Sequence, residues 1–503
     1  MPPPRTPTRP SPLAPPPPLR PRNPFAILVQ EVRAERANTI PYPPGETGFS
    51  MARTRRFARE PLGLLLECYE RYGPVFTIRV LHGNVVFMLG PAANHYVTVS
   101  HAANFRWRDS HFRELIGLLG DGLLTIDGDF HRRSRRIMLP AFHREQVAAS
   151  VGVMVEETEA ALERLRPGER LDLYGWTRGL AMRIAMGALF GLDPDGPVAR
   201  ETDAAALFER ALSFYAREYT TRFLRGPLTP WGQMQAARRR LDGVIYGEIA
   251  RRRASGERGG DVLSLLLDAR DEEGGELGET QIRDEVMTLL FAGHDTTTST
   301  VSFMFHELAR RPEIGRRLVA EQDERLGGRR PTAGELMGEG LPELEMVLEE
   351  TLRMYPPAWI GPRRAVEAFE FEGHSVPGDA YVNYCSWASH HLPDVWPEPD
   401  RFRPERFAPG ARESIPKGAY VPFGGGSRTC IGMRFGELEV RTIATLMLRR
   451  FSLELEPGFA LSIRQMPTIS PREGLPVIVR ERFAAAPAVA ASSGAGAGAG
   501  ATG

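Results

Sequence analysis

The stretch Phe423-Gly-Gly-Gly-Ser-Arg-Thr-Cys-Ile-Gly432 leads directly into an apolar helical run at 433–450. Cys430 therefore stands just before a helix N-terminus, where the helix dipole and free N–H groups favour a thiolate. The glycines let the backbone pass close to a large flat ligand, and Arg428 can meet an anionic group at its edge. The sequence has no G-x-x-x-x-G-K-[ST] phosphate loop here. A buried, inert cysteine is the alternative interpretation.

A second informative stretch lies upstream, where 279–310 carries apolar residues at steps of three and four and predicts one long helix. It contains Ala-Gly-His-Asp-Thr-Thr at 292–297. Gly293 removes a side chain where a ligand must press, and Thr296 can hydrogen-bond backward to a carbonyl, which loosens one turn. Asp295 beside Thr296 can then relay protons to a reducing oxygen species. An exposed polar patch is the alternative, and the histidine of this motif is interpreted as structural.

The remaining chain favours helices with short strands between them. The predicted helices include 145–165, 237–252 and 433–450, and the strand signals lie at 75–90, 369–382 and 475–480. We therefore expect a mainly α fold with a minor β-sheet. Proline-rich residues 1–24 and Ala/Gly-rich residues 484–503 are expected to be disordered tails around one domain at 25–483.

Composition narrows the class of protein. The 63 basic and 63 acidic residues give a formal net charge of +0, so no global field favours nucleic acid or a membrane surface. No apolar run approaches the ~18 residues that a membrane span needs, and the N-terminus lacks the apolar core of a signal peptide. Only 3 cysteines occur, far apart in the chain. We expect a cytoplasmic protein that binds no nucleic acid and has no membrane span.

Taken together, the two motifs resemble those of the cytochrome P450 superfamily. The haem-binding signature F-x-x-G-x-R-x-C-x-G is matched at Phe423, Gly426, Arg428, Cys430 and Gly432. The resemblance implies the P450 fold, with the long central helix over haem b. It implies that the Cys430 thiolate is the proximal ligand of the haem iron, which favours O–O cleavage. It further implies that Arg428 pairs with a haem propionate, and that Asp295 and Thr296 deliver protons.

Two more segments match the family. Glu350-x-x-Arg353 places both residues on one helix face, where by itself it would be an ordinary surface ion pair. Downstream, Pro-Glu-Arg-Phe at 404–407 resembles the family segment whose arginine joins that pair. The resemblance implies a buried structural network of Glu350, Arg353 and Arg406 that positions the cysteine loop.

The resemblance also implies further haem-binding residues. His131 and Arg135 lie on one face of a predicted helix, and Arg363 lies in a strand-like stretch. These residues match positions that hold propionates in relatives. A solvated basic face is the alternative for this cluster, and such a face could also attract an acidic electron donor.

The expected function is that of a haem-thiolate monooxygenase, which hydroxylates or epoxidises a hydrophobic terpenoid, steroid, fatty acid or polyketide. Its partners would be a ferredoxin and a ferredoxin reductase, and the chain is expected to be a monomer. The alternatives are a peroxide-using or isomerising haem-thiolate enzyme and a non-catalytic haem binder. The substrate pocket is expected to be lined by Phe112, Leu115, Leu119, Leu289, Ala292, Trp359, Ile360, Met466 and Ile469.

Overall fold

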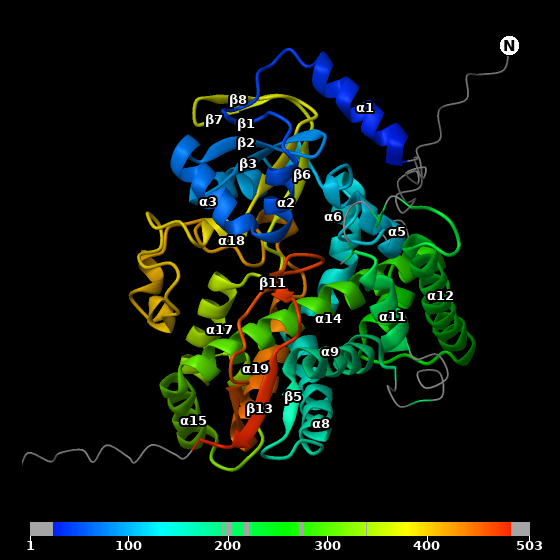
Figure 1. Cartoon of the computed structure of the whole chain (residues 1–503). Coiled ribbons are helices and arrows are strands. Elements are labelled where there is room, and N and C mark those ends of the chain that lie inside the picture. The colour runs from blue at the N-terminus through cyan, green and yellow to red at the C-terminus, as the bar shows by residue number, and fades with distance from the viewer. Residues whose placement is uncertain are drawn as a thin grey trace, which may run out of the picture.

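Helices form most of the molecule, and small sheets gather at one end and along one side (Figure 1). The computed structural model describes residues 24–192, 196, 204–215, 217, 221–222, 224–270, 276–338 and 340–483. The prediction of a mainly α fold with a minor β-sheet is confirmed. The two predicted tails lie outside the described residues, except for Pro24, at which helix α1 begins.

The longer helices build the body of the molecule. They are α1 (Pro24–Ala37), α2 (Met51–Arg59), α3 (Pro61–Tyr72), α6 (Gly128–Met138), α8 (Val151–Leu162), α9 (Leu173–Ile184), α11 (Ala204–Ser213), α12 (Pro230–Ser255), α14 (Glu279–Arg310), α15 (Pro312–Leu326), α17 (Pro342–Met354) and α19 (Met433–Arg450). The shorter ones are α4 (Pro91–His95), α5 (Ile116–Leu119), α7 (Arg144–Ala149), α13 (Val262–Asp268), α16 (Ala333–Leu336) and α18 (Ser386–Ser389). None of the described helices combines the length and the apolar character that a bilayer crossing requires.

The strands form one larger sheet and three small ones. The larger sheet has the order β1-β2-β3-β9-β6-β4, with β2 paired to β3 antiparallel and β3 paired to β9 parallel. The small sheets have the orders β10-β13-β5, β11-β12 and β7-β8. The bounds are β1 (Gly45–Glu46), β2 (Val75–Val80), β3 (Gly83–Met88), β4 (Phe105–Arg106), β5 (Arg170–Asp172), β6 (Gly361–Ala365), β7 (Phe369–Phe371), β8 (His374–Val376), β9 (Tyr381–Tyr384), β10 (Phe451–Leu455), β11 (Ile463–Arg464), β12 (Ser470–Pro471) and β13 (Pro476–Glu481).

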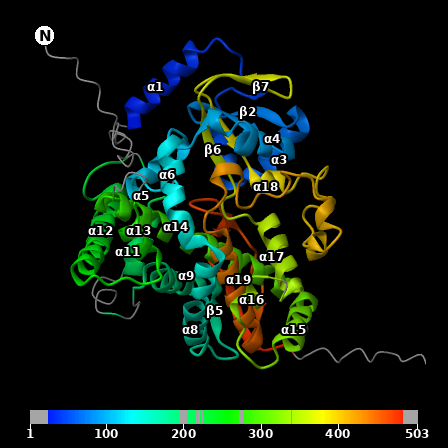
Figure 2. The ribbon, with the colours of Figure 1, turned by 180° about the vertical axis from the view of Figure 1, so that it is seen from behind.

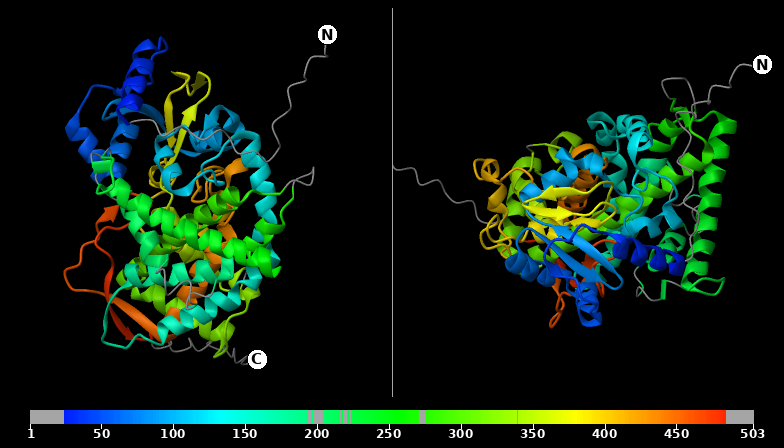
Figure 3. Two further views of the ribbon diagram at one scale, coloured as in Figure 1. Left: turned by 90° about the vertical axis from the view of Figure 1, so that its right-hand side faces the viewer. Right: turned by 90° about the horizontal axis from the view of Figure 1, so that it is seen from above.

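Helix α14 is the central element of the fold. Its 32 residues span about 48 Å and cross the middle of the molecule, between the large sheet and the α8–α9 end (Figures 2 and 3). The helix ends at Arg310 because Arg311 precedes Pro312 and leaves the helical region, with φ −135° and ψ 69°. Helices α5, α9, α12, α17 and α19 all pack against it.

Most predicted elements occur where the sequence placed them, with two differences. The expected helix at 145–165 is divided into α7 and α8, and the Ser150 hydroxyl between them donates to the Gln146 carbonyl four residues back, a contact that bends helices. The strand signal at 369–382 is divided into β7, β8 and the start of β9, because Gly373 turns the chain with φ 77°.

A buried ion network connects α17 to the segment that follows β9. The Glu350 carboxylate accepts hydrogen bonds from Arg353 Nε at 2.7 Å and Nη2 at 2.9 Å, and from Arg406 Nε at 3.3 Å. It also accepts from the backbone N–H of Arg403 at 2.8 Å. Glu350 and Arg353 are 0% exposed. This carboxylate therefore holds two guanidiniums that are buried, at Arg353 completely and at Arg406 almost completely.

His390 extends this network to the approach of the cysteine loop. Its Nδ1 donates to the Arg353 carbonyl at 3.0 Å, and its Nε2 accepts from the backbone N–H of Val421 at 2.9 Å. Arg353 Nη1 in turn donates to the His390 carbonyl at 2.8 Å. Burial lowers the pKa of His390 to about 3, and the charge of Arg353 lowers it further. The imidazole is therefore neutral, as the bond from Val421 requires.

Replacing Glu350 tests the network. Glu350→Gln keeps the shape of the side chain but leaves two buried cations unneutralised, so we expect a loss of about 3–5 kcal/mol in the free energy of unfolding. Urea unfolding of the holoprotein measures it. Glu454→Gln is the matched control, because it makes the same chemical change in an ion pair with Arg480 whose two side chains are both about half exposed, and it should cost less than about 1 kcal/mol. Equal losses in the two variants would contradict a structural network.

The neutral state of His390 predicts a dependence of stability on pH. An unfolded histidine takes up a proton below about pH 6.5 and the folded one does so only near pH 3, so stability present above pH 6.5 is lost as the pH falls. Between about pH 7.5 and about pH 5, the wild type should lose about 2 kcal/mol more than His390→Gln, which cannot titrate. Urea midpoints across this range measure the difference. A difference independent of pH would show that His390 does not carry it.

Candidate active site

The loop before α19 places Cys430 at its end. The Cys430 N–H donates to the Phe423 carbonyl at 2.9 Å, which closes the loop around the glycines. Gly426 has φ 62°, and a Cβ atom there would lie 2.0 Å from the Thr98 carbonyl oxygen. Only glycine therefore lets the loop lie against the segment Tyr96–Ser100. Helix α19 begins three residues after the cysteine.

The Cys430 side chain is exposed, whereas the other two thiols, of Cys68 and Cys385, are buried. Protein atoms nevertheless enclose it, and this enclosure raises the pKa of the thiol. The backbone N–H of Gly432 and the charge of Arg135 act in the opposite direction and favour the thiolate. A metal cation bound to the sulfur would favour the thiolate further, because a thiol that coordinates a metal ion is deprotonated.

Helix α14 is open to space at one place in its middle. Between residues 281 and 308 every residue is buried except Ala292, which is exposed, and Gly293 and Thr296, which are partly exposed. A Cβ atom at Gly293 would meet nothing nearer than Leu189 Cδ1, at 4.0 Å. These three residues lie at steps of one, three and four, and so form one window on a single face of the helix.

The two predicted proton-relay residues point in different directions. Thr296 Oγ1 donates to the Ala292 carbonyl at 2.7 Å, inside the open window. The Asp295 carboxylate is 1% exposed and lies behind the window, where its Oδ2 accepts from Thr468 Oγ1 at 2.5 Å. The back-bonded threonine weakens the helical ladder at that turn. Asp295 therefore faces the protein interior, whereas the Thr296 hydroxyl faces the open window.

Predicted propionate-binding residues gather on the cysteine side. His131 on α6 is 5% exposed, and burial lowers its pKa to about 3. The positive charges of Arg428, Arg135 and Arg363 contribute to this shift in the same direction. Arg363, on β6, is 7% exposed and lies over the ring of Tyr384. Their concentration of positive charge suits a ligand that carries carboxylates.

Arg428 already has an anionic partner in the protein. Its Nη2 donates to the Asp127 carboxylate and to the Ile126 carbonyl. Asp127 also accepts from the backbone N–H groups of Trp107 at 3.0 Å and Arg108 at 2.8 Å. Burial lowers the pKa of Arg428 to about 10, and Asp127 opposes that shift. Arg428 therefore ties the cysteine loop to the residues before α6 and keeps its other nitrogens for a ligand.

Several predicted pocket residues are brought to α14. The segment that carries Phe112, Leu115 and Leu119 is held there, because Arg283 donates to the Leu119 carbonyl at 3.2 Å. The Ile469 carbonyl accepts from Ser299 Oγ at 2.5 Å. On α14 itself, Leu289, Ala292, Thr296 and Ser299 recur at steps of three and four and share one face.

Trp359, one of the predicted pocket residues, is buried and makes contacts with several segments. Its Nε1 donates to the Gln465 carbonyl at 2.8 Å, and its ring lies against Trp387 and Phe57. Ile360, the next residue, and Met466, next to Gln465, are both partly buried. Trp359 thus contacts both Gln465 and Trp387, two residues that line a pocket.

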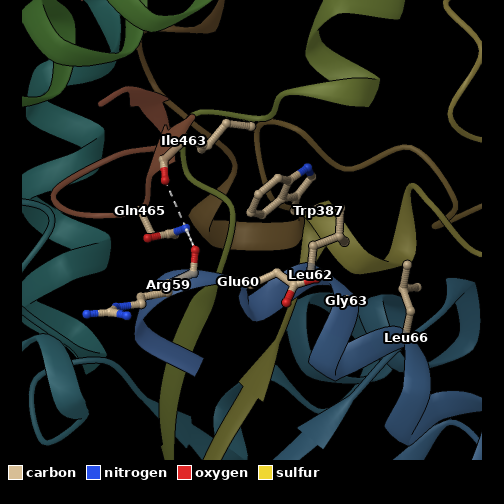
Figure 4. Close-up of a pocket in the computed structure, with 8 residues that line it drawn as sticks. All are labelled: Arg59, Glu60, Leu62, Gly63, Leu66, Trp387, Ile463 and Gln465. Atoms are coloured by element: carbon tan, nitrogen blue, oxygen red, sulfur yellow. Dashed lines mark hydrogen bonds between the residues drawn. The ribbon is translucent and has the colours of Figure 1, made fainter. Parts of the chain in front are cut away.

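This pocket has a volume of about 370 Å³ and opens between α2, α3, α18 and the end of β11 (Figure 4). In Figure 4 the Gln465 amide donates to the carbonyls of Arg59 and Ile463, both at 3.1 Å. The lining residues are Arg59, Glu60, Leu62, Gly63, Leu66, Trp387, Ile463 and Gln465. Cys430 and the α14 window are not among them.

The residues around Cys430 fit a haem. The glycine loop lies against the segment Tyr96–Ser100 of the same chain and ends at an exposed thiol. The α14 window offers a face without large side chains, and the arginine and histidine cluster suits two propionates. A sulfur ligand, a flat bed and an anion-binding edge are the three features that a haem with a thiolate ligand requires.

Sequence reasoning missed four residues that the structure adds to the site. Asp127 binds Arg428, Thr468 and Arg178 contact Asp295, and His390 joins the ion network to the cysteine loop. Only Asp127 has a local sequence signal. It comes shortly before His131 and Arg135 on their predicted helix, and aspartate is a preferred residue at the position that precedes a helix. The other contacts join segments far apart in the chain, and no local pattern indicates them.

Comparison with known proteins gives the same result along nearly the whole described chain. The cytochrome P450 family model matches residues 43–472. Cyclooctat-9-en-7-ol 5-monooxygenase of Streptomyces melanosporofaciens is 36% identical over 352 residues, which are 68% of this chain and 75% of that protein. A putative cytochrome P450 120 of Synechocystis is 30% identical over 449 residues, 88% of this chain and 97% of that one.

Solved structures agree with the sequence relatives. The retinoic acid-bound cyanobacterial CYP120A1 superposes with a TM-score of 0.78 at 30% identity and covers 88% of this chain and 100% of its own. The haem domain of cytochrome P450DA gives a TM-score of 0.78 at 26% identity, with coverage of 88% and 98%. With the thiol loop, the window in α14 and the buried Glu350 network, these matches establish that the chain belongs to the cytochrome P450 family and is a P450 monooxygenase.

Proposed function

We propose that this P450 inserts one atom of O₂ into a C–H bond or a double bond of a hydrophobic terpenoid, while the other atom leaves as water. The balance requires two electrons and two protons for each product molecule. The observation that carries the proposal is that the Cys430 thiol, at the end of its glycine loop, is exposed. The thiols of Cys68 and Cys385, by contrast, are buried. Haem b, when bound, supplies the iron on which oxygen is activated.

In this proposal Cys430 ligates the iron, and the positive cluster holds the propionates. Arg428 stays bound to Asp127 while its free nitrogens meet one carboxylate. His131 is neutral, since burial lowers its pKa to about 3, and it can donate one N–H to a propionate. Arg135 also favours the thiolate by its charge. Phe423 and Gly432 shape the loop on either side of the sulfur.

Proton delivery is assigned to Asp295 and Thr296. The Thr296 hydroxyl lies in the open window and is bound to the Ala292 carbonyl, so it would be able to turn and donate a proton toward the open face of the helix. Asp295 is buried next to it and supplies the proton from the interior side. A positioned proton donor of this kind typically contributes about 10²–10⁴ in rate.

The proposed substrate is apolar with few polar groups. Leu115, Leu119, Leu289 and Ile469 are buried on the segments that meet at the α14 face, and the other apolar residues proposed for the pocket, Phe112, Ile360 and Met466, are partly buried. Two of the relatives carry the names cyclooctat-9-en-7-ol 5-monooxygenase and cyclooctatin synthase. The apolar residues and these names together favour a terpenoid over the other classes.

The electrons are proposed to come from a ferredoxin and its reductase. Arg132 and Arg136 are exposed on α6, the helix that also carries His131 and Arg135. An exposed basic face close to the proposed haem edge suits an acidic electron donor. The buried free thiols of Cys68 and Cys385 suit a reducing cytoplasm, where such partners occur.

The spectrum of the purified protein tests the sulfur ligand. The reduced, carbon monoxide-treated protein should show a Soret band at the wavelength typical of thiolate ligation, and Cys430→Ser should abolish it. Cys68→Ser is the control, because it removes a buried thiol elsewhere and should leave the band unchanged. A wild-type spectrum without that band, or an unchanged one in Cys430→Ser, would remove the basis of the proposal.

Oxygen consumption tests the relay. A panel of lipophilic compounds is screened for those that shift the haem from low to high spin, and one that does so is used as substrate. With a surrogate ferredoxin, Thr296→Ala should continue to consume electrons and O₂ while product per electron falls by about tenfold or more. Thr300→Ala, one turn farther on and bound to the Thr296 carbonyl, should stay near the wild type. Unchanged coupling in Thr296→Ala would show that its hydroxyl is not in the relay.

A further inference from the structure

A cluster of buried charges surrounds Asp295 on the side away from the α14 window. Arg178 of α9 places Nη2 at 3.4 Å from Asp295 Oδ1, and the two side chains are 14% and 1% exposed. Oδ1 accepts no hydrogen bond from the described residues. The distance is thus within ion-pair range but longer than the 2.7–2.9 Å of a charge-assisted hydrogen bond. Asp295 holds a nearby cation without being bonded to it.

Arg178 is bound elsewhere. Its Nε donates to the Glu209 carboxylate of α11, and its Nη1 donates to Tyr174 Oη at 2.7 Å. The Glu209 side chain is 40% exposed, so one end of the cluster reaches water. The guanidinium therefore lies between two carboxylates, one half-exposed and hydrogen-bonded, the other buried and at a longer distance.

His294 fixes the geometry of this arrangement. Its Nε2 donates to the Arg178 carbonyl at 3.0 Å and lies 3.4 Å from Glu209 Oε1. Burial lowers its pKa to about 4, so the ring is neutral and adds no charge. Phe208, next to Glu209, lies edge-on to the ring of His294 at 5.7 Å. Helix α11 is thereby held against α14 one residue before Asp295.

We propose that Glu209 and Arg178 are positioning residues for the Asp295 carboxylate: Glu209 draws the Arg178 guanidinium away from Asp295, and so keeps Asp295 free to pass protons to Thr296. The inference rests on the proposed relay. Without the charge on Glu209, Asp295 is the remaining carboxylate in contact with Arg178 among the described residues. The guanidinium would then close onto Oδ1, and a carboxylate held in a full ion pair is a poorer carrier of protons.

Glu209→Gln tests this directly, because it keeps the shape of the side chain and removes its charge. In a crystal structure of this variant, the distance from Arg178 Nη2 to Asp295 Oδ1 should fall from 3.4 Å into hydrogen-bond range. Product per electron should fall by about three- to tenfold, a part of what a positioned proton donor contributes, and the solvent deuterium isotope effect should rise. Glu209→Asp, which restores the charge, should recover most of the loss.

The matched control is Glu157→Gln, which removes the acidic partner of Arg183 on the same helix α9. It should leave coupling and the isotope effect unchanged. In an Asp295→Asn background, Glu209→Gln should have no further effect, because the group that it positions is gone.

The outcomes separate this inference from the proposed function. If Asp295→Asn itself leaves coupling unchanged, the relay assignment fails. If Asp295→Asn lowers coupling, and Glu209→Gln either has no effect or lowers it equally in both backgrounds, Glu209 does not act through Asp295 and the inference is overturned. An unchanged Arg178–Asp295 distance in the variant crystal overturns it as well.

Discussion

The buried Glu350 carboxylate holds Arg353 and Arg406, and through them the path of the chain that leads to the cysteine loop. Arg353 and His390 donate hydrogen bonds to each other's carbonyls, and His390 accepts one from the Val421 N–H. Displacement of the Glu350 carboxylate would therefore shift the backbone at Val421, two residues before Phe423. Burying such a set of charges gives little net stability compared with apolar residues. Its effect is geometric, since each partner has one low-energy position.

A second constraint is the interruption of an otherwise buried helix. Between residues 281 and 308, helix α14 is covered by protein on all sides except at Ala292, Gly293 and Thr296. There the small side chains leave an accessible face, and the Thr296 hydroxyl donates a hydrogen bond to the backbone carbonyl of Ala292 in the preceding turn. The charged residues Asp295, Arg178 and Glu209 stand behind this window, and their exposure to water rises from 1% at Asp295 through 14% at Arg178 to 40% at Glu209. The fold thus combines an apolar reaction face with a separate supply of protons.

Much of the fold follows from local pattern. The bounds predicted for the helices at 279–310 and 433–450 agree with α14 and α19, since both are long amphipathic or buried runs with clear ends. The helix at 145–165 was wrong in its continuity, because the backward bond of Ser150 depends on a rotamer that periodicity does not describe. Likewise no local pattern indicates that the indole N–H of Trp359 donates to the Gln465 carbonyl, 106 residues farther along the chain.

The sequence alone determined the cysteine loop, the long helix with its acid and alcohol, and the Glu350–Arg353 pair, because each depends on residue types at short spacings. Only the tertiary structure decided which partners those residues take. Asp127 on Arg428, Thr468 and Arg178 on Asp295, and His390 on Val421 join segments distant in the chain. The physical reason is that a buried charge must be satisfied by whatever polar group the packing brings near, and packing is a property of the whole fold.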